Sequence, residues 1–176
     1  GSRPFRATGF RVDTTVCLSQ GWRRGGRRHQ NPRVRILVTN DDGIDSPGLH
    51  ALAQRMTALG EVIVFAPSSE FSGAGAAIGH LSEGVPDVHT VTRPEMPDVA
   101  AAHHIGGPPA LASMLACHGL FGAPPDVVVS GINPGWNVGW SVLFSGTVGA
   151  CLTARVCGIS GIAVSQRRAH PDEPQQ

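Results

Sequence analysis

The sequence contains no lysine and no tyrosine, and only 15% of its residues are charged. All fourteen basic residues are therefore arginine, which we attribute to coding bias. No apolar run approaches the roughly 18 residues of a membrane-spanning helix, and no signal-peptide core is evident, so we expect no membrane partner and a cytoplasmic location. The four cysteines show no CxxC spacing, which argues against zinc or disulfides and predicts buried thiols.

The remaining composition suits one compact, loop-rich α/β domain, since 41% of the 176 residues are hydrophobic and 23 are glycine. Residues 1–33 hold eight arginines against one acid, whereas residues 34–176 hold six against twelve acids. We predict a disordered, Arg-rich leader or mis-set start at residues 1–33, the domain at residues 34–166, and a polar tail at residues 167–176. A nucleic-acid-binding arm and a transit peptide are alternatives for the first segment, although we expect no nucleic-acid partner.

An apolar run at residues 34–38 is followed by two adjacent carboxylates, Asp41 and Asp42. Its β-branched and aliphatic side chains predict a buried strand of a parallel sheet. Two neighbouring carboxylates in a partly desolvated cleft repel each other unless a cation lies between them or one is protonated. Open α/β sheets also bind their ligands at such strand ends. The pair therefore indicates a divalent metal site, with a plain Asp-Asp-Gly turn as the alternative.

The next segments predict a right-handed βαβ unit and a loop of small residues. Ser46 can cap a helix that is expected to continue with apolar residues at helical spacing and to end at Gly60. Residues 61–66 then form a second buried strand. The loop at residues 67–75 follows at the same sheet edge as the aspartates. It contains Ser72, a candidate oxygen ligand or an ordinary turn residue.

The middle of the chain gives weaker signals. Residues 88–92 suggest a short strand, and His103 and His104 mark the end of another. Neighbours in a strand point to opposite faces, so we interpret this histidine pair as structural. A helix begun by proline is expected at residues 108–119, and the continuous apolar run at residues 126–130 predicts a third central strand.

A helix start near the end of the chain indicates an anion site. Ser145, Gly146 and Thr147 precede a helix expected at residues 148–156, and a last strand is expected at residues 159–165. Free N–H groups at a helix start, together with the helix dipole, can hold an anion such as phosphate. The alternative is that these residues form only a good helix cap.

All candidate side chains fall at the carboxyl ends of predicted strands or in the turns after them. Asn133, in the glycine-rich loop at residues 131–139 that also carries Asn137, completes the set. Oxygen ligands, two of them charged, suit Mg²⁺ or Mn²⁺ and not zinc. A metal beside an anion-binding helix start indicates phosphoryl chemistry.

Four sequence blocks in this order, TNDDG, SGAG, VSGINPGWNVG and FSGTVGA, resemble the signature of the SurE family of survival-protein nucleotidases. The resemblance covers about residues 34–165. It implies a Rossmann-like three-layer α/β sandwich with a mostly parallel central sheet. It further implies a metal-dependent enzyme that hydrolyses nucleoside 5′- or 3′-monophosphates to nucleoside and phosphate, with one Mg²⁺ or Mn²⁺ per subunit and a metal-activated water. A homodimer or homotetramer is implied for the full-length protein.

The resemblance also implies roles for individual residues. The implied metal ligands are Asp41, Asp42, Ser72 and Asn133. The implied phosphate-binding residues are Asn137, Ser145, Gly146 and Thr147. Either of the two aspartates is a candidate for the catalytic proton transfer.

Three departures from the family pattern leave an alternative open. The family's Gly-Thr-Pro-x-Asp-Cys block is Gly-Gly-Pro-Pro-Ala-Leu at residues 106–111, and Gly75 and Gly79 replace common hydroxyl residues. Family members usually run some tens of residues further, so we expect a C-terminally truncated chain. The alternative is thus a truncated or inactive homologue that binds metal or a partner without turnover. A receiver domain is set aside because the third strand ends in Ser130 and no lysine is present.

Overall fold

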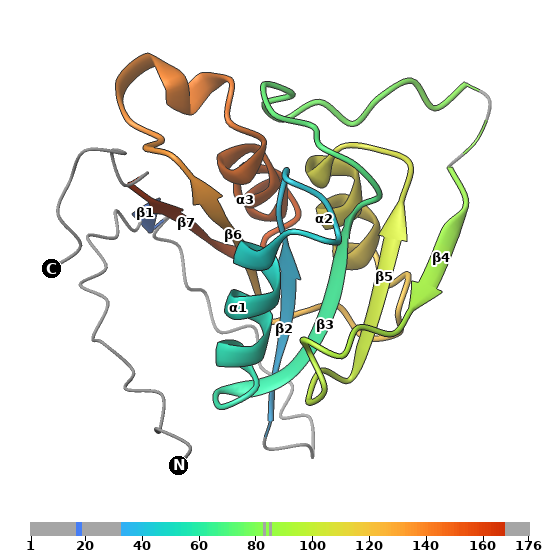
Figure 1. Cartoon of the computed structure of the whole chain (residues 1–176). Coiled ribbons are helices and arrows are strands. Elements are labelled where there is room, and N and C mark those ends of the chain that lie inside the picture. Colours follow the sequence, from blue (N-terminus) through green and yellow to red (C-terminus); the bar gives the residue numbers. More distant parts are fainter. Residues whose placement is uncertain (1–16, 19–32, 83, 85, 168–176) are drawn as a thin grey trace, which may run out of the picture.

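The computed structural model describes residues 17–18, 33–82, 84 and 86–167, which form a sheet with helices on both faces (Figure 1). The elements are β1 (Cys17–Leu18), β2 (Val34–Thr39), α1 (Pro47–Met56), β3 (Gly60–Pro67), β4 (Val88–Val91), β5 (Ala101–Ile105), α2 (Pro109–Cys117), β6 (Val127–Pro134), the 3-10 helix η1 (Gly139–Leu143), α3 (Gly146–Val156) and β7 (Ser160–Gln166). Within these described ranges, no helix is long and apolar enough to cross a membrane.

The sheet has seven strands in the order β1-β7-β6-β2-β3-β5-β4. Its central strands, from β7 across to β5, all run parallel, whereas β1 and β4 pair antiparallel at the two edges. The predicted α/β class with a mostly parallel sheet is confirmed. Because the central strands are parallel, their carboxyl ends all meet one edge of the sheet.

Side chains of β2 alternate between two cores and so define three layers. Ile36 and Val38 pack with Leu49 and Leu52 of α1 on one face. Leu37 packs on the other face, in a cluster that includes residues of α2 and α3. Figure 1 shows the same arrangement, with α1 on one side of the sheet and α2 and α3 on the other. Burial on both faces explains the continuous apolar run of β2.

β6 extends further than the sequence predicts. The predicted strand stops at residue 130, but β6 continues to Pro134 and pairs with β7 as far as Gln166. A register shift between Ser130 and Asn133 accommodates the continuation. Gly131 lies inside it with φ +136°, and a Cβ there would be 2.3 Å from the Val164 carbonyl oxygen. This glycine, which suggested a loop, is required by the close approach of β7.

The segment predicted to be disordered contains one short strand. Cys17–Leu18 form β1, which pairs with Ile162 and Ala163 of β7. The open edge of β7 supplies this pairing, which no periodicity in a two-residue strand could indicate. The other residues predicted as leader, 1–16 and 19–32, and those from 168 onward in the tail lie outside the described ranges.

The histidine pair occupies opposite faces of β5. The His103 ring stacks on Phe121, with ring centroids 4.3 Å apart, and contacts Phe65 edge-on. The His104 ring stacks on His89 of β4, with centroids 5.1 Å apart. The predicted orientation is confirmed, and both rings pack against aromatic neighbours.

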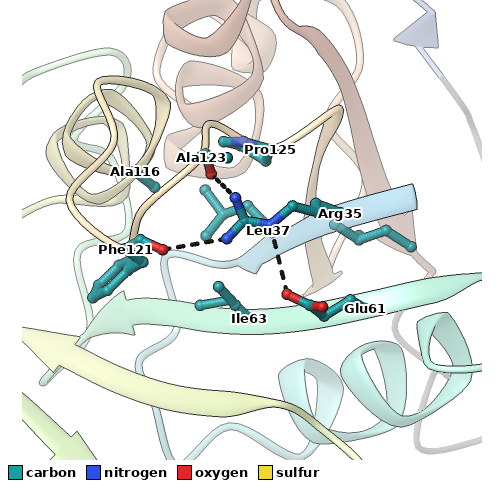
Figure 2. A pocket seen from close by; sticks show the side chains of 9 residues that line it. Arg35, Leu37, Glu61, Ile63, Ala116, Phe121, Ala123 and Pro125 are labelled. Carbon is teal, nitrogen blue, oxygen red and sulfur yellow. Dashed lines mark hydrogen bonds and ion pairs between the residues drawn. The ribbon is translucent and has the colours of Figure 1, made fainter. Parts of the chain in front are cut away.

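Arg35, the second residue of β2, joins three segments (Figure 2). The guanidinium of Arg35 donates to the carbonyl oxygens of Ala123 and Phe121, the latter at 3.2 Å, and its Nε lies 3.5 Å from Oε1 of Glu61. Its backbone amide donates to Oδ2 of Asp126 at 2.8 Å. The small pocket around this arginine is therefore a structural contact between β2, β3 and the segment before β6.

Candidate functional site

β2 ends in the turn that carries the two predicted metal-ligand aspartates. Asp41 is buried, with 3% of its surface exposed, and Asp42 is half-buried. The preceding Asn40 is fully buried and donates from Nδ2 to the carbonyl oxygen of Gly43 at 3.0 Å. Gly43 has φ +98°, a conformation that favours glycine. The Asn-Asp-Asp-Gly sequence therefore forms a tight turn that holds one carboxylate inside the protein.

The start of α3 contacts that buried carboxylate. Ser145 is the N-cap, and its Oγ accepts a 3.2 Å hydrogen bond from the amide of Val148. Thr147 donates from Oγ1 to Oδ1 of Asp41 at 2.6 Å. A Cβ at Gly146 would lie 2.7 Å from the Cβ of Asp41, so glycine is needed between the helix start and the aspartate. The strand-end carboxylate and the amide end of α3 are thus in direct contact.

The loop after β3 lies against both of these elements. The amide of Phe71 donates to the backbone carbonyl oxygen of Asp41 at 2.7 Å. Further along, a Cβ at Gly149 of α3 would be 2.0 Å from the carbonyl oxygen of Gly75. Ser72 lies between these two contacts and is exposed. The structure therefore brings the predicted serine ligand to the edge occupied by the aspartates and α3.

The two predicted asparagines lie at the β6 end of the same edge. Asn133 donates from Nδ2 to a backbone carbonyl two residues further on, at 2.9 Å. Asn137 donates from Nδ2 to Oγ of Ser165 at 2.8 Å. A Cβ at Gly48 of α1 would be 2.5 Å from the carbonyl oxygen of Ile132, so the end of β6 abuts the helix that follows the aspartate turn. Both asparagines are thus held by hydrogen bonds within the β6–β7 region.

The charges around this edge are acidic. Residues 127–154 contain no Asp, Glu, Arg, Lys or His, so neither the end of β6 nor the start of α3 offers a cationic side chain. Beside the aspartate turn, Arg93 is paired with Asp45, with nitrogens 2.8 and 2.7 Å from Oδ1. An anion bound here would depend on backbone N–H groups and an added cation for neutralisation.

Three buried oxygen atoms support a polar ligand at this edge. Thr39 Oγ1, Asn40 Oδ1 and Ser130 Oγ have no hydrogen-bond partner within the described ranges, although all three residues are fully buried. Thr39 and Ser130 are register partners near the carboxyl ends of β2 and β6. Buried polar atoms nearly always have a partner, so unsatisfied oxygens at a strand end are consistent with an oxygen-preferring cation and its hydration shell.

The donor set fits a hard cation and not zinc. The described residues contain no group of three or more His, Cys, Asp or Glu placed to hold a metal. The predicted site offers two carboxylates and otherwise neutral oxygens. Because the hydrogen bond of Asn133 uses its amide nitrogen, its Oδ1 is the atom suited to a cation.

Sequence analysis missed two polar side chains that contact predicted site residues. Glu70 Oε1 accepts a 2.8 Å hydrogen bond from Oγ of Ser72. Ser165 accepts the hydrogen bond from Asn137. Ser165 could have been found, because β7 is another strand whose carboxyl end meets this edge. The Glu70 contact depends on the loop conformation, which residue types do not reveal.

Comparison with known proteins shows one consistent family. A family model described as "Survival protein SurE" matches residues 36–176. The 5′-nucleotidase SurE of Rhodopirellula baltica is 45% identical over 134 residues, which cover 75% of this chain and 51% of that protein. The corresponding protein of Methanopyrus kandleri is 47% identical over 133 residues, covering 76% and 49%.

A solved structure gives the same result. The SurE protein from Aquifex aeolicus superposes with a TM-score of 0.61 at 34% identity, covering 72% of this chain and 48% of that one. The chain spans about half the length of the curated relatives it matches. Sequence, fold and the order of the strand-end residues agree, and the chain belongs to the SurE family.

Proposed function

We propose that this chain binds one Mg²⁺ or Mn²⁺ and hydrolyses nucleoside 5′- or 3′-monophosphates to nucleoside and phosphate. The main support is the 2.6 Å hydrogen bond between Thr147 and Asp41, because it joins a candidate phosphate-binding residue to a candidate metal ligand. Relatives described as 5′-nucleotidases support the substrate class. Since the chain spans about half of their length, the activity is a proposal for this protein.

The cation would be held by Asp41, Asp42, Ser72 and Asn133. Thr147 occupies Oδ1 of Asp41, which leaves Oδ2 for the cation. Ser72 uses its proton in the bond to Glu70, so the lone pairs of its Oγ are available.

The phosphate would bind at the start of α3. Ser145 directs its side chain to the helix's own amide, so it stabilises the helix start. Glycine at position 146 allows a ligand to approach the N–H groups of the first turn. Asn137, on the neighbouring loop, would add a side-chain contact.

Hydrolysis needs a water aligned with the phosphorus atom and a group that takes its proton. A bound divalent cation lowers the pKa of water and neutralises phosphate charge. Asp42 is the carboxylate that we assign to accept the proton, because Asp41 is more buried and already accepts from Thr147. The amides of α3 stabilise the added charge as the bond to the nucleoside oxygen breaks, and that oxygen takes up a proton from solvent to give the free nucleoside.

The test is phosphate release from AMP and other nucleoside monophosphates, with Mn²⁺ or Mg²⁺ and with chelator. We expect metal-dependent turnover that falls at least about 100-fold in Asp42→Asn. Asp45→Asn is the matched control, since this neighbouring aspartate is paired with Arg93. Mn²⁺ binding without phosphate release from the unmodified chain would instead support the inactive-homologue alternative.

A further inference from the structure

The loop between Asn133 and Ser145 carries an unusual set of exposed apolar side chains. We call residues 135–144 the rim loop; in Figure 1 it is the orange segment that joins β6 to α3. Its exposed fractions are 43% for Trp136, 52% for Val138, 83% for Trp140, 64% for Leu143 and 63% for Phe144.

The rim loop is held in place, so its exposed side chains are not the result of a frayed segment. The amide of Gly135 donates to the Gln166 carbonyl oxygen at 2.8 Å. Asn137 donates to Ser165, and at the far end the Phe144 carbonyl oxygen accepts from an amide in the loop that carries Ser72. These contacts fix the loop at both ends beside the proposed metal and phosphate groups.

We infer that Trp136 and Trp140 form a stacking surface for the nucleobase of the bound nucleotide. This inference depends on the proposed function for the identity of the ligand, because a nucleoside monophosphate bound at α3 is what would present a base to the rim loop. Trp136 and Trp140 lie on either side of Asn137 in the sequence, and Asn137 is a proposed phosphate contact, so one loop would serve both parts of the substrate.

The chemistry of the rim loop favours a base over other occupants. It has no charged residue, so it would not select a charged partner, whereas an indole offers a flat apolar face. Stacking of a base on an aromatic side chain contributes about 1–3 kcal/mol and tolerates every base. We therefore expect the enzyme to distinguish nucleotides from base-free sugar phosphates more than it distinguishes one base from another.

Intrinsic fluorescence can test this contact without turnover. The chain has three tryptophans and no tyrosine, so the Trp22→Phe variant would report only on Trp136 and Trp140. In this variant, without added metal, we expect AMP and adenosine to quench the emission in a saturable manner. Ribose 5-phosphate should leave it unchanged. Equal responses to AMP and ribose 5-phosphate, or none to either, would overturn the inference.

Kinetics give an independent measurement. We expect the double variant Trp136→Ala, Trp140→Ala to lose about 5- to 150-fold in kcat/KM for AMP, mainly through KM. Ribose 5-phosphate turnover should stay unchanged. Leu143→Ala is the matched control, since it removes an exposed apolar side chain of the same loop.

The outcomes separate this inference from the proposed function. If the unmodified chain hydrolyses neither substrate, the proposed function fails, and the quenching by AMP still decides the inference. Equal losses for both substrates would overturn the stacking role. So would unchanged kinetics together with a shift from dimer to monomer in sedimentation of the double variant, because the tryptophans would then be a contact between copies.

Discussion

The hydroxyl of Thr147 donates a 2.6 Å hydrogen bond to the carboxylate of Asp41, from the first turn of α3 to the end of β2. Both side chains are buried, and the two residues are far apart in the sequence. The bond fixes one carboxylate oxygen and orients the other. A residue that we propose to bind phosphate thus also positions a proposed metal ligand.

Replacing this threonine by valine should affect stability and metal binding together. Thr147→Val leaves a buried carboxylate without its donor, so we expect the free energy of unfolding to fall by about 1–3 kcal/mol. Mn²⁺ affinity, measured by calorimetry, should fall about 10- to 100-fold because the ligand is no longer oriented. The Thr147→Ser variant keeps the hydroxyl, so it should retain most of the stability and most of the Mn²⁺ affinity. Lost stability with unchanged Mn²⁺ affinity would limit Thr147 to a structural role.

A methyl group at residue 149 should separate the Ser72 loop from α3. The added Cβ would lie 2.0 Å from the Gly75 carbonyl oxygen. Because this contact is with main-chain atoms, relieving it would require the backbone of the loop or of α3 to shift. We expect Gly149→Ala to destabilise the protein by about 1–3 kcal/mol in urea unfolding. Gly106→Ala is the control, since no atom lies within 4 Å of its added Cβ. Equal stability of the two variants would contradict the tight contact.

Acid should destabilise the protein through the histidines of β5. Burial lowers the pKa of His103, and burial followed by the charges of His89 and Arg93 lowers the pKa of His104. Below about pH 6.5 the unfolded chain therefore binds more protons than the folded one, so stability is full above this pH and is lost as the pH falls. Between pH 8 and about pH 5, the melting temperature of the His103→Gln variant should decline less than that of the unmodified protein. An unchanged decline would show that His103 does not contribute to the loss of stability in acid.

One cysteine should resist alkylation while the protein is folded. Burial, with Cys157 nearby, raises the pKa of the Cys117 thiol to about 12, so almost none of it is thiolate at neutral pH. Iodoacetamide followed by peptide mass spectrometry should label Cys117 only after denaturation. Rapid labelling of the folded protein would show that the C-terminal end of α2 opens.

The order of elements and the sheet edge that gathers the candidate residues were predictable, because they follow from local patterns. Apolar runs identified β2, β3 and β6, and the rule that ligands bind at carboxyl strand ends selected the aspartates and the start of α3. The family resemblance then supplied roles that no local pattern gives. Those roles, like the cytoplasmic location and the oligomeric state, stay predictions.

Contacts between distant segments could not be predicted. Thr147 was expected to bind phosphate, and its bond to Asp41 depends on how α3 sits over the sheet. Gly131 suggested a loop because glycine usually interrupts strands, whereas its missing side chain makes room for Val164 of β7. The residue type limits the contacts that a position can make, and the tertiary packing determines which of them forms.

β1 lies along the outer side of β7, where its short antiparallel pairing covers part of an otherwise open strand edge. Removing residues 1–32 would uncover backbone N–H and C=O groups at Ile162 and Ala163, which are then able to pair with a second molecule. Shortening the protein at its arginine-rich start is therefore expected to promote edge-to-edge aggregation, even though the proposed catalytic groups all lie elsewhere.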